Sequence, residues 1–320
     1  MALLSKQPMG HGLLRFRTRV VALAAMLAAC EPTNIPNSDA GVSGDAGASR
    51  DGGASRDAGV SGDAGVSGDA GVSGDAGGVG GYAAVVLLDH PVAYFRFGES
   101  SGSTAADQIA GAPVGTYFGG VTLGAAGIVA HDSAITLDGT SGCVSVGDYF
   151  RFAGRVEFSV EAWVKLTAYG EEGTRLLSTE GFPTGVRGGW NLSANYPHSG
   201  FPYFDAWNSD GEDNLYTMGA YASVSPAEGE LPLGAWSHLV GTYSDEHEEL
   251  WVNGVRRDRQ NQSTHPIPTM QGALSIGCAS DGSGPIYLGV HGTLDEVAIY
   301  DHVLTGDRIA AHFTAGGGSR

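Results

Sequence analysis

The sequence predicts an all-β fold for its C-terminal part, a sandwich of two antiparallel sheets. Apolar residues recur at every second position or in short runs in segments such as Trp236–Tyr243, Glu249–Gly254 and Ala273–Gly277. Gly, Asn and Asp bound these segments, as expected for strands joined by tight turns. Asn253-Gly254 is such a turn, because both residues tolerate positive φ. One short helix is expected at the end, over Leu304 to Phe313.

Motifs in a fixed order extend this prediction to a known family. They are Pro91–Glu99, Ala105–Gly111, Leu137–Gly139 with Val144–Val146, Phe158–Val164, Trp236–Tyr243 and His291–Tyr300. Through them the chain resembles LamG-like jellyroll domains of the concanavalin A-like lectin and glucanase group, over residues 82–316. Two positions depart from the family pattern, since Phe95 stands where Trp is usual and Cys143 where Tyr is usual. The resemblance implies a two-sheet jellyroll.

Residues 1–29 have the features of a bacterial lipoprotein signal peptide. A basic region with Lys6 and Arg15 precedes an apolar stretch, Val20–Ala28. That stretch is shorter than the roughly 20 residues of a membrane-spanning helix. It ends in Leu27–Cys30, a lipobox-like motif, so we expect Cys30 to carry the lipid. An ordinary secretory signal is the alternative. We expect an exported protein, anchored in the cell envelope at the outer membrane or cell surface.

Residues 30–81 predict a disordered spacer. An Asp recurs every six residues from Asp39 to Asp75, mostly as D-A-G-V-S-G. Bulky apolar groups are almost absent, so nothing offsets the entropy of ordering. A calcium-binding β-roll would need closer Asp spacing and a bulky inward residue in every repeat.

The charge argues against nucleic-acid partners. The whole chain has a formal net charge of −18, and the signal peptide holds four basic and no acidic residues. The mature chain is therefore at −18 − 4 = −22. Such a charge repels phosphate backbones.

Two cysteines remain in the folded region, Cys143 and Cys278. Cysteines of exported proteins commonly pair. The sequence does not give their separation, so a disulfide and two free thiols both stay open.

The segment Phe158–Leu166 supplies the first candidate binding residues. Its apolar positions alternate with Ser159, Glu161, Trp163 and Lys165. The apolar set should pack between the sheets, and the other set should lie on an outer face. There Trp163 could stack on a sugar while Glu161 accepts hydroxyl hydrogen bonds. The alternative is a structural role, because the resemblance places Trp and Glu here in relatives of many functions.

A second candidate lies in Trp190–Tyr221, where aromatic residues alternate with Asn, Asp and Gly. Such loops supply contact area and hydrogen bonds in ligand sites. Trp207 and Asn208 are the most promising pair, although alternate aromatic residues could equally fill the core.

Hydrolase activity is not expected. Related glucanases place E-x-D-x-x-E on one strand, which supplies the two carboxyl groups of retaining hydrolysis. The matching strand here has only Glu161, and Lys165 takes the place of the second acid. Lys165 could form an ion pair with Glu161, which would keep Glu161 ionised.

The resemblance also implies a structural calcium site. Glu99, Asp107 and Asp295 lie in the motifs concerned, and hard oxygen ligands suit Ca²⁺. The alternative is that Asp107 and Asp295 bond to local backbone.

Together these features predict a surface-anchored recognition or adhesion lipoprotein. Its jellyroll would bind a glycan or protein ligand outside the cell, and it would meet the membrane through the lipid alone. A glycoside hydrolase of the same fold group and a purely structural envelope protein are the alternatives, since fold alone does not choose among them.

Overall fold

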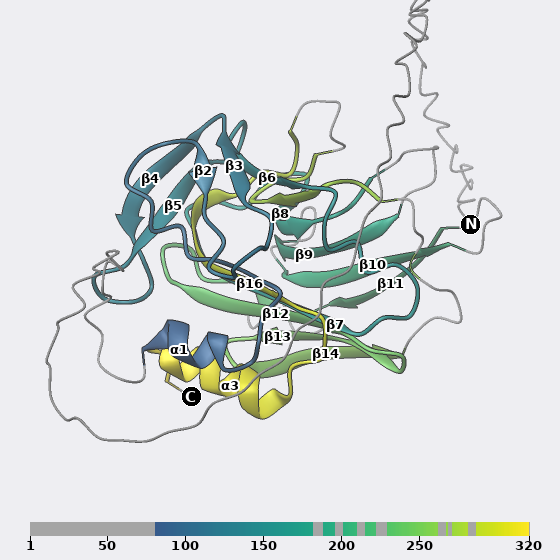
Figure 1. The fold of residues 1–320 in the computed structure, drawn as a ribbon. Coiled ribbons are helices and arrows are strands. Elements are labelled where there is room, and N and C mark those ends of the chain that lie inside the picture. The colour runs from purple at the N-terminus through teal and green to yellow at the C-terminus, as the bar shows by residue number, and fades with distance from the viewer. Residues whose placement is uncertain are drawn as a thin grey trace, which may run out of the picture. The chain divides into compact units, whose positions relative to one another are not determined.

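A computed structural model describes residues 81–181, 188–195, 201–209, 215–221, 229–261, 267, 271–280 and 286–319 (Figure 1). The predicted signal peptide and all but the last residue of the predicted spacer lie outside the described residues. The described part is a sandwich of two antiparallel β-sheets, each of eight strands, as the sequence predicts.

Sheet A contains the strand that carries Glu161 and Trp163. Its order is β14-β13-β12-β7-β16-β5-β4, and β1 pairs with β16 off this path. The last strand in the chain, β16, thus lies between β7 and β5. The strands of sheet A are β1 (Ala93–Phe95), β4 (Val121–Ala126), β5 (Ser133–Asp138), β7 (Phe158–Leu166), β12 (Ser237–Tyr243), β13 (His247–Val252), β14 (Val255–Asn261) and β16 (His291–Tyr300).

Sheet B has the order β11-β10-β9-β8-β15-β6-β3-β2. Its strands are β2 (Thr104–Ala105), β3 (Gly115–Phe118), β6 (Cys143–Gly147), β8 (Thr174–Ser178), β9 (Gly189–Asn195), β10 (Tyr203–Ser209), β11 (Leu215–Tyr221) and β15 (Leu274–Ile276).

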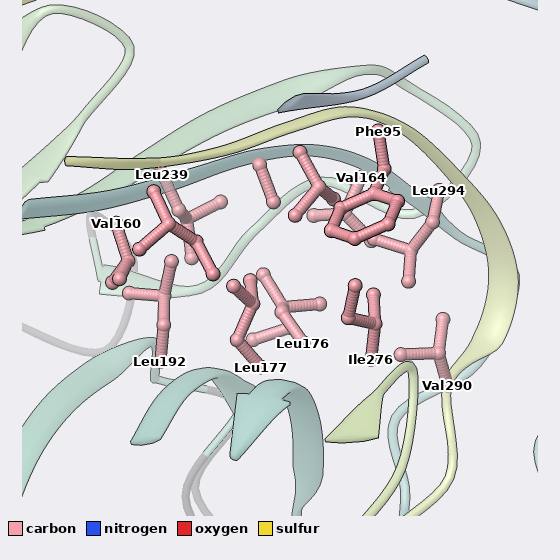
Figure 2. Close-up of a cluster of buried hydrophobic side chains, with 14 of the residues drawn as sticks. Phe95, Val160, Val164, Leu176, Leu177, Leu192, Leu239, Ile276, Val290 and Leu294 are labelled. Carbon is pink, nitrogen blue, oxygen red and sulfur yellow. The ribbon is translucent and has the colours of Figure 1, made fainter. Parts of the chain in front are cut away.

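The main hydrophobic core lies between the sheets (Figure 2). Val160 and Val164 of β7 belong to it together with Leu177 and Leu192 of sheet B, and all four are at most 1% exposed. The expectation that the apolar positions of Phe158–Leu166 pack between the sheets is confirmed. Burying one such side chain contributes about 1.5–3 kcal/mol, so this core dominates the stability of the domain.

Two helices pack on the outer face of sheet A. They are α1 (Tyr82–Leu87) and α3 (Gly306–Ala315), and Figure 1 shows them side by side. The predicted C-terminal helix is α3, which begins after Thr305, whose hydroxyl accepts a hydrogen bond from Arg308 N. No sequence pattern predicted α1. A second apolar cluster, including Tyr82, Trp163 and Phe313, joins both helices to the sheet.

Two local features matter below. Asn253 and Gly254 have φ of 52° and 72°, as predicted for the tight β13–β14 turn. In β16 the register with β7 shifts between Asp295 and Ala298, and Glu296 takes a φ of 50°. This bulge brings two consecutive acidic residues to one region instead of opposite faces. Among the described residues, neither helix is long and apolar enough to cross a membrane.

Candidate functional site

A row of polar side chains follows the outer face of sheet B. Leu192 and Ala194 of β9 point into the core, so Asn191 and Ser193 face outward. The strand register continues this arrangement on both neighbours, since Arg175 lies opposite Ser193 and Asp205 lies opposite Asn191. We call this row the polar face. Its members are Arg175, Ser178, Asn191, Ser193, Tyr203, Asp205 and Ser275.

Arg175 is the centre of the polar face. Its Nη2 lies 3.0 Å from Glu180 Oε2, and its Nη1 donates to Ser193 Oγ at 3.1 Å. Nη1 also donates to the hydroxyl of Tyr203, and the guanidinium lies 5.1 Å from the centre of the Tyr203 ring. Arg175 is only 3% exposed. The guanidinium is therefore held in one orientation by neighbours on three strands or their ends.

Asn191 adds a hydrogen-bond donor to the polar face. Its Oδ1 accepts from Ser193 Oγ at 2.8 Å, but its Nδ2 has no hydrogen-bond partner in the described structure. A buried donor left unpaired costs about 1–3 kcal/mol, so an acceptor beside it would be stabilising. The polar face thus holds donors and acceptors side by side, with Asn191 and Ser193 both 0% exposed. Sequence reasoning missed it, although Asn191-Leu-Ser-Ala-Asn195 alternates polar and apolar residues.

The predicted pair Trp207 and Asn208 lies on β10, two or three residues beyond Asp205. In backbone register Trp207 lies opposite Gly189 and Thr217. The side chains of both residues lie outside the described part of the structure, so their predicted role in binding stays a prediction.

Glu161 and Trp163 lie together, but on a covered face. Glu161 is 0% exposed and Trp163 is 2% exposed, because α1 and α3 pack over this part of β7. Trp163 stacks between His238 and Phe313, with ring centres at 4.9 and 5.9 Å. Its Nε1 donates to Tyr82 Oη at 3.0 Å. The expectation of an exposed sugar-binding surface here is corrected: a ligand would have to displace both helices.

Glu161 is the centre of a buried hydrogen-bond network. It accepts from Tyr300 Oη at 2.5 Å, and the nearest nitrogens of His238 and His312 are each 2.9 Å away. On its other side, His312 Nε2 lies 2.7 Å from Asp89. Lys165 is not a partner, contrary to expectation; its ammonium lies over the Trp236 ring instead.

The network fixes the protonation of its members. Burial alone would raise the pKa of Glu161, but His312 and His238 outweigh it and hold that pKa well below its usual range. Burial also lowers the pKa of His312, yet Glu161 and Asp89 outweigh this and raise it. For His238 burial prevails, and its pKa is lowered. These shifts favour an ionised Glu161, a protonated His312 and a neutral His238.

A second acidic cluster forms at the bulge of β16. Asp295, Glu296 and Asp132 offer carboxylate oxygens within 4.8 Å of one another. The guanidinium of Arg96 pairs with Asp132 and, at 3.2 Å, with Glu296. Burial raises the pKa of Asp295 to about 8, and burial together with Asp295 raises that of Glu296. One arginine does not balance three carboxylates, so a divalent cation fits both the charge and the oxygen donors.

The structure does not gather the predicted calcium ligands Glu99, Asp107 and Asp295. Glu99 accepts from Ala106 N and Tyr117 Oη, at 2.7 and 2.6 Å. Asp107 Oδ1 accepts from two backbone N–H groups, those of Tyr94 and Ile109. Both carboxylates therefore accept hydrogen bonds from within the fold. Asp295 joins Asp132 and Glu296 instead, although it also accepts from the N–H of Ile128 at 2.8 Å.

Cys143 and Cys278 form a disulfide, as one reading of the sequence predicted. The bridge links β6 to the residue two positions after β15, across 135 residues of chain. Both cysteines are fully buried.

The two antiparallel sheets, with the strand orders given above, define a jellyroll-type β-sandwich. A family model described as "Concanavalin A-like lectin/glucanases superfamily" matches residues 138–310. The chain belongs to this family. Mouse pentraxin-related protein PTX3 is 29% identical over 127 residues, which cover 35% of this chain and 33% of that protein. The chain thus matches about a third of the length of this curated relative.

Solved structures share the fold. One is domain 4 of AbnA, a GH43 extracellular arabinanase from Geobacillus stearothermophilus, in complex with arabinotriose. It has a TM-score of 0.51 at 17% identity and covers 69% of this chain and 97% of that one. The binding domain of Paraclostridial Mosquitocidal Protein 1 has a TM-score of 0.52 at 13% identity, and the match covers 71% of this chain and 52% of that one. The binding domain of botulinum neurotoxin serotype D has a TM-score of 0.51 at 12% identity, and the match covers 71% of this chain and 51% of that one. At these identities the likeness concerns the fold alone.

Proposed function

We propose that this chain is a recognition module that binds a glycan through the polar face of sheet B. The observation that carries the proposal is the fixed guanidinium of Arg175 beside the unpaired amide of Asn191. A sugar hydroxyl both donates and accepts, so it can accept from Asn191 Nδ2 while donating to a neighbouring oxygen. Both outer faces are buried in the described structure, since α1 and α3 cover sheet A while Asn191 and Arg175 on sheet B are 0% and 3% exposed. Binding therefore requires that the cover of the polar face opens to admit the glycan.

The family relationship supports the same proposal. Domain 4 of the arabinanase was solved in complex with arabinotriose, and two further structural neighbours are called binding domains. A protein ligand remains the alternative partner, and the experiment below distinguishes the two.

Binding without cleavage is part of the proposal. Glu161 already accepts hydrogen bonds from three side chains and is fully buried. Asp295 and Glu296 form a close pair of carboxyl groups with raised pKa values. Glycosidases also use a pair of carboxyl groups, one with a raised pKa. Asp295 and Glu296 are both 0% exposed, however, so a scissile bond has no room between them.

The proposed location is the outside of a bacterial cell. Leu27–Cys30 supports lipid attachment at Cys30, and disulfides such as Cys143–Cys278 persist in oxidising compartments. Residues 30–81 would then serve as a tether between the lipid and the jellyroll.

Calcium is proposed as a structural ligand of Asp132, Asp295 and Glu296. Their carboxylates supply hard oxygen donors, and a bound cation would replace the protons that burial otherwise imposes on Asp295 and Glu296. Its contribution would be to hold the bulge of β16 against Asp132.

A glycan array tests the function. The purified full-length chain should bind a defined set of glycans, and Asn191→Ala should weaken that binding about tenfold, the loss of one to two hydrogen bonds. Tyr203→Phe, which removes a hydroxyl bonded to Arg175, should act in the same direction. Thr122→Ala, an exposed change on sheet A, is the control. Capture of a protein ligand with no glycan bound would overturn the proposal, as would reducing ends released by the wild type.

A further inference from the structure

A cavity of about 100 Å³ lies beside the turn between β13 and β14. The segment that leads into β12 forms one wall and the hairpin forms the other. The cavity shares no residue with the polar face of sheet B. Its lining includes Glu230, Leu231, Pro232, Val252, Asn253 and Arg257.

The positively charged residue of this cavity, Arg257, lies at a β-bulge. Trp251 lies opposite Arg256 and Leu250 lies opposite Asp258, so Arg257 is the extra residue of β14. Bulges occur at sheet edges, where they redirect one side chain out of the regular alternation. Here the redirected residue is the one that lines the cavity.

The three arginines of β14 differ in how they are used. Arg256 Nη1 lies 3.0 Å from Glu249 Oε1, and Arg259 Nε lies 3.3 Å from the same oxygen. Arg257 forms no side-chain hydrogen bond or ion pair with the residues that the structure describes. The whole chain has 17 basic against 35 acidic residues, yet three of the 17 lie in this one strand. An uncommitted guanidinium in such an acidic protein is a local site for an anion.

The other polar groups of the cavity indicate which class of ligand fits it. Asn253 Oδ1 accepts from His238 N at 2.8 Å, which leaves the Asn253 amide NH₂ as a donor. Arginine binds carboxylate and sulfate oxygens with two parallel N–H donors and stays charged at every working pH. Glu230, by contrast, only accepts when ionised, so it suits a hydroxyl donor beside the anion.

We infer that this cavity binds the anionic group of an acidic saccharide, a carboxylate or a sulfate ester, on Arg257. A volume of about 100 Å³ is several times the minimum that holds one water, so the cavity has room for the anionic group. Glu230 lines the same cavity, where a hydroxyl of the saccharide would donate to its carboxylate. An acidic peptide also carries backbone N–H donors, so the titration below compares the two ligand classes directly. The inference adds a second site to the proposed glycan recognition and rests on that proposal only in taking the ligand to be a saccharide.

Calorimetric titration of the full-length chain tests this inference. The probes are an oligogalacturonate, a sulfated dextran and a neutral dextran of matched length, with a polyglutamate peptide as the fourth. The two acidic saccharides should bind more tightly than neutral dextran. Arg257→Gln should weaken their binding about tenfold. Arg257→Lys, which keeps the charge but loses the paired donors, should weaken this binding less. Both variants should have the melting temperature of the wild type.

Arg256→Gln is the matched control, since it removes an equal charge from the same strand. It should change affinity by less than about twofold. Equal losses from the Arg256 and Arg257 changes would overturn the inference and indicate a diffuse basic strand. Tighter binding of polyglutamate than of both acidic saccharides would overturn the inference in favour of a peptide ligand. The absence of binding by either acidic saccharide would also overturn the inference. Asn191→Ala separates the two proposals, because it should spare Arg257-dependent binding even if the polar face binds nothing.

Discussion

His312 Nδ1 lies 2.9 Å from Glu161 Oε2, which joins the C-terminal helix to the centre of sheet A through a buried ion pair. The two residues are 151 positions apart in the chain, and neither side chain is exposed to solvent. His312 also reaches Asp89, just after α1, so a single imidazole connects both helices with the sheet.

This ion pair predicts a defined pH window of stability. The pKa of His312 is raised above 6.5, so its contribution is complete below pH 6.5 and is lost as pH rises through the folded-state pKa. The pKa of Glu161 is lowered below 4.5, so its contribution is present above pH 4.5 and is lost as pH falls through the folded-state pKa. The contribution is therefore largest between pH 4.5 and 6.5.

His312→Gln should cost about 3–5 kcal/mol within that window, because it leaves a buried carboxylate without its cation. The difference from wild type should shrink as pH rises through the folded-state pKa of His312. Urea unfolding at one pH inside the window and one well above it measures this. His302→Gln changes a partly exposed histidine outside the network and should cost little at either pH. A cost for His312→Gln that does not vary with pH would contradict the ion pair.

Trp163→Ala should destabilise the fold instead of weakening a ligand. The indole is 2% exposed and stacks between two rings, so its removal leaves a cavity costing about 3–5 kcal/mol. Thermal unfolding should show a fall of many degrees. Tyr149→Ala, at a residue that is 51% exposed, should change stability by less than about 1 kcal/mol. If Trp163→Ala melts with the wild type, α1 and α3 do not cover this face in solution.

Removing the disulfide should lower stability by up to about 5 kcal/mol, the chain-entropy value for a loop of 135 residues. The double variant Cys143→Ala, Cys278→Ala and the reduced wild type should show similar urea midpoints, both below that of the oxidised protein. Equal midpoints with and without reductant, combined with two titratable thiols, would show that the bridge does not form.

Calcium should raise the melting temperature, by an amount that depends on pH. An ion at a hundred times its Kd stabilises by about 2.7 kcal/mol. Because burial raises the pKa of Asp295 to about 8, an ion must displace a proton at pH 6 but much less so at about pH 9. The shift should therefore be larger at the higher pH. Asp132→Asn should abolish it, whereas Glu99→Gln should preserve it. The opposite pattern would restore the ligand set expected from the motifs.

Lipid attachment is predicted at Cys30. Labelled palmitate should enter the wild-type protein and not the Cys30→Ser variant, which should also leave the membrane fraction or remain unprocessed. Label in the Cys30→Ser variant, or none in the wild type, would contradict the lipobox.

Local pattern predicted the strands well, because alternation and turn chemistry are properties of neighbouring residues. The Asn253-Gly254 turn and the apolar side of β7 are correct for that reason. The alternation along β7 showed that one side is apolar and the other carries Glu161 and Trp163. It did not show that helices cover this second side. The cover includes α1, a helix of six residues with no side-chain N-cap, too short for a periodic signal.

The candidate site was less predictable, because its partners are distant in the sequence. Glu161 meets His238 and His312 only through strand register and the docking of α3, so Lys165 appeared to be the nearest charge. Asp132 joins Asp295 because a bulge turns the end of β16 toward it. The polar face required the register of β8, β9 and β10, which no single strand reveals.

The place of β16 determines when the domain can be completed. Its ten residues are the last strand to be synthesised, yet they lie between β7 and β5. Until Tyr300 has emerged from the ribosome or translocon, both neighbours present bare edges that can pair wrongly with each other or with another chain. Sheet A therefore cannot be completed before β16 has been synthesised. A chain whose synthesis stalls before residue 291 would expose these edges and be prone to aggregate.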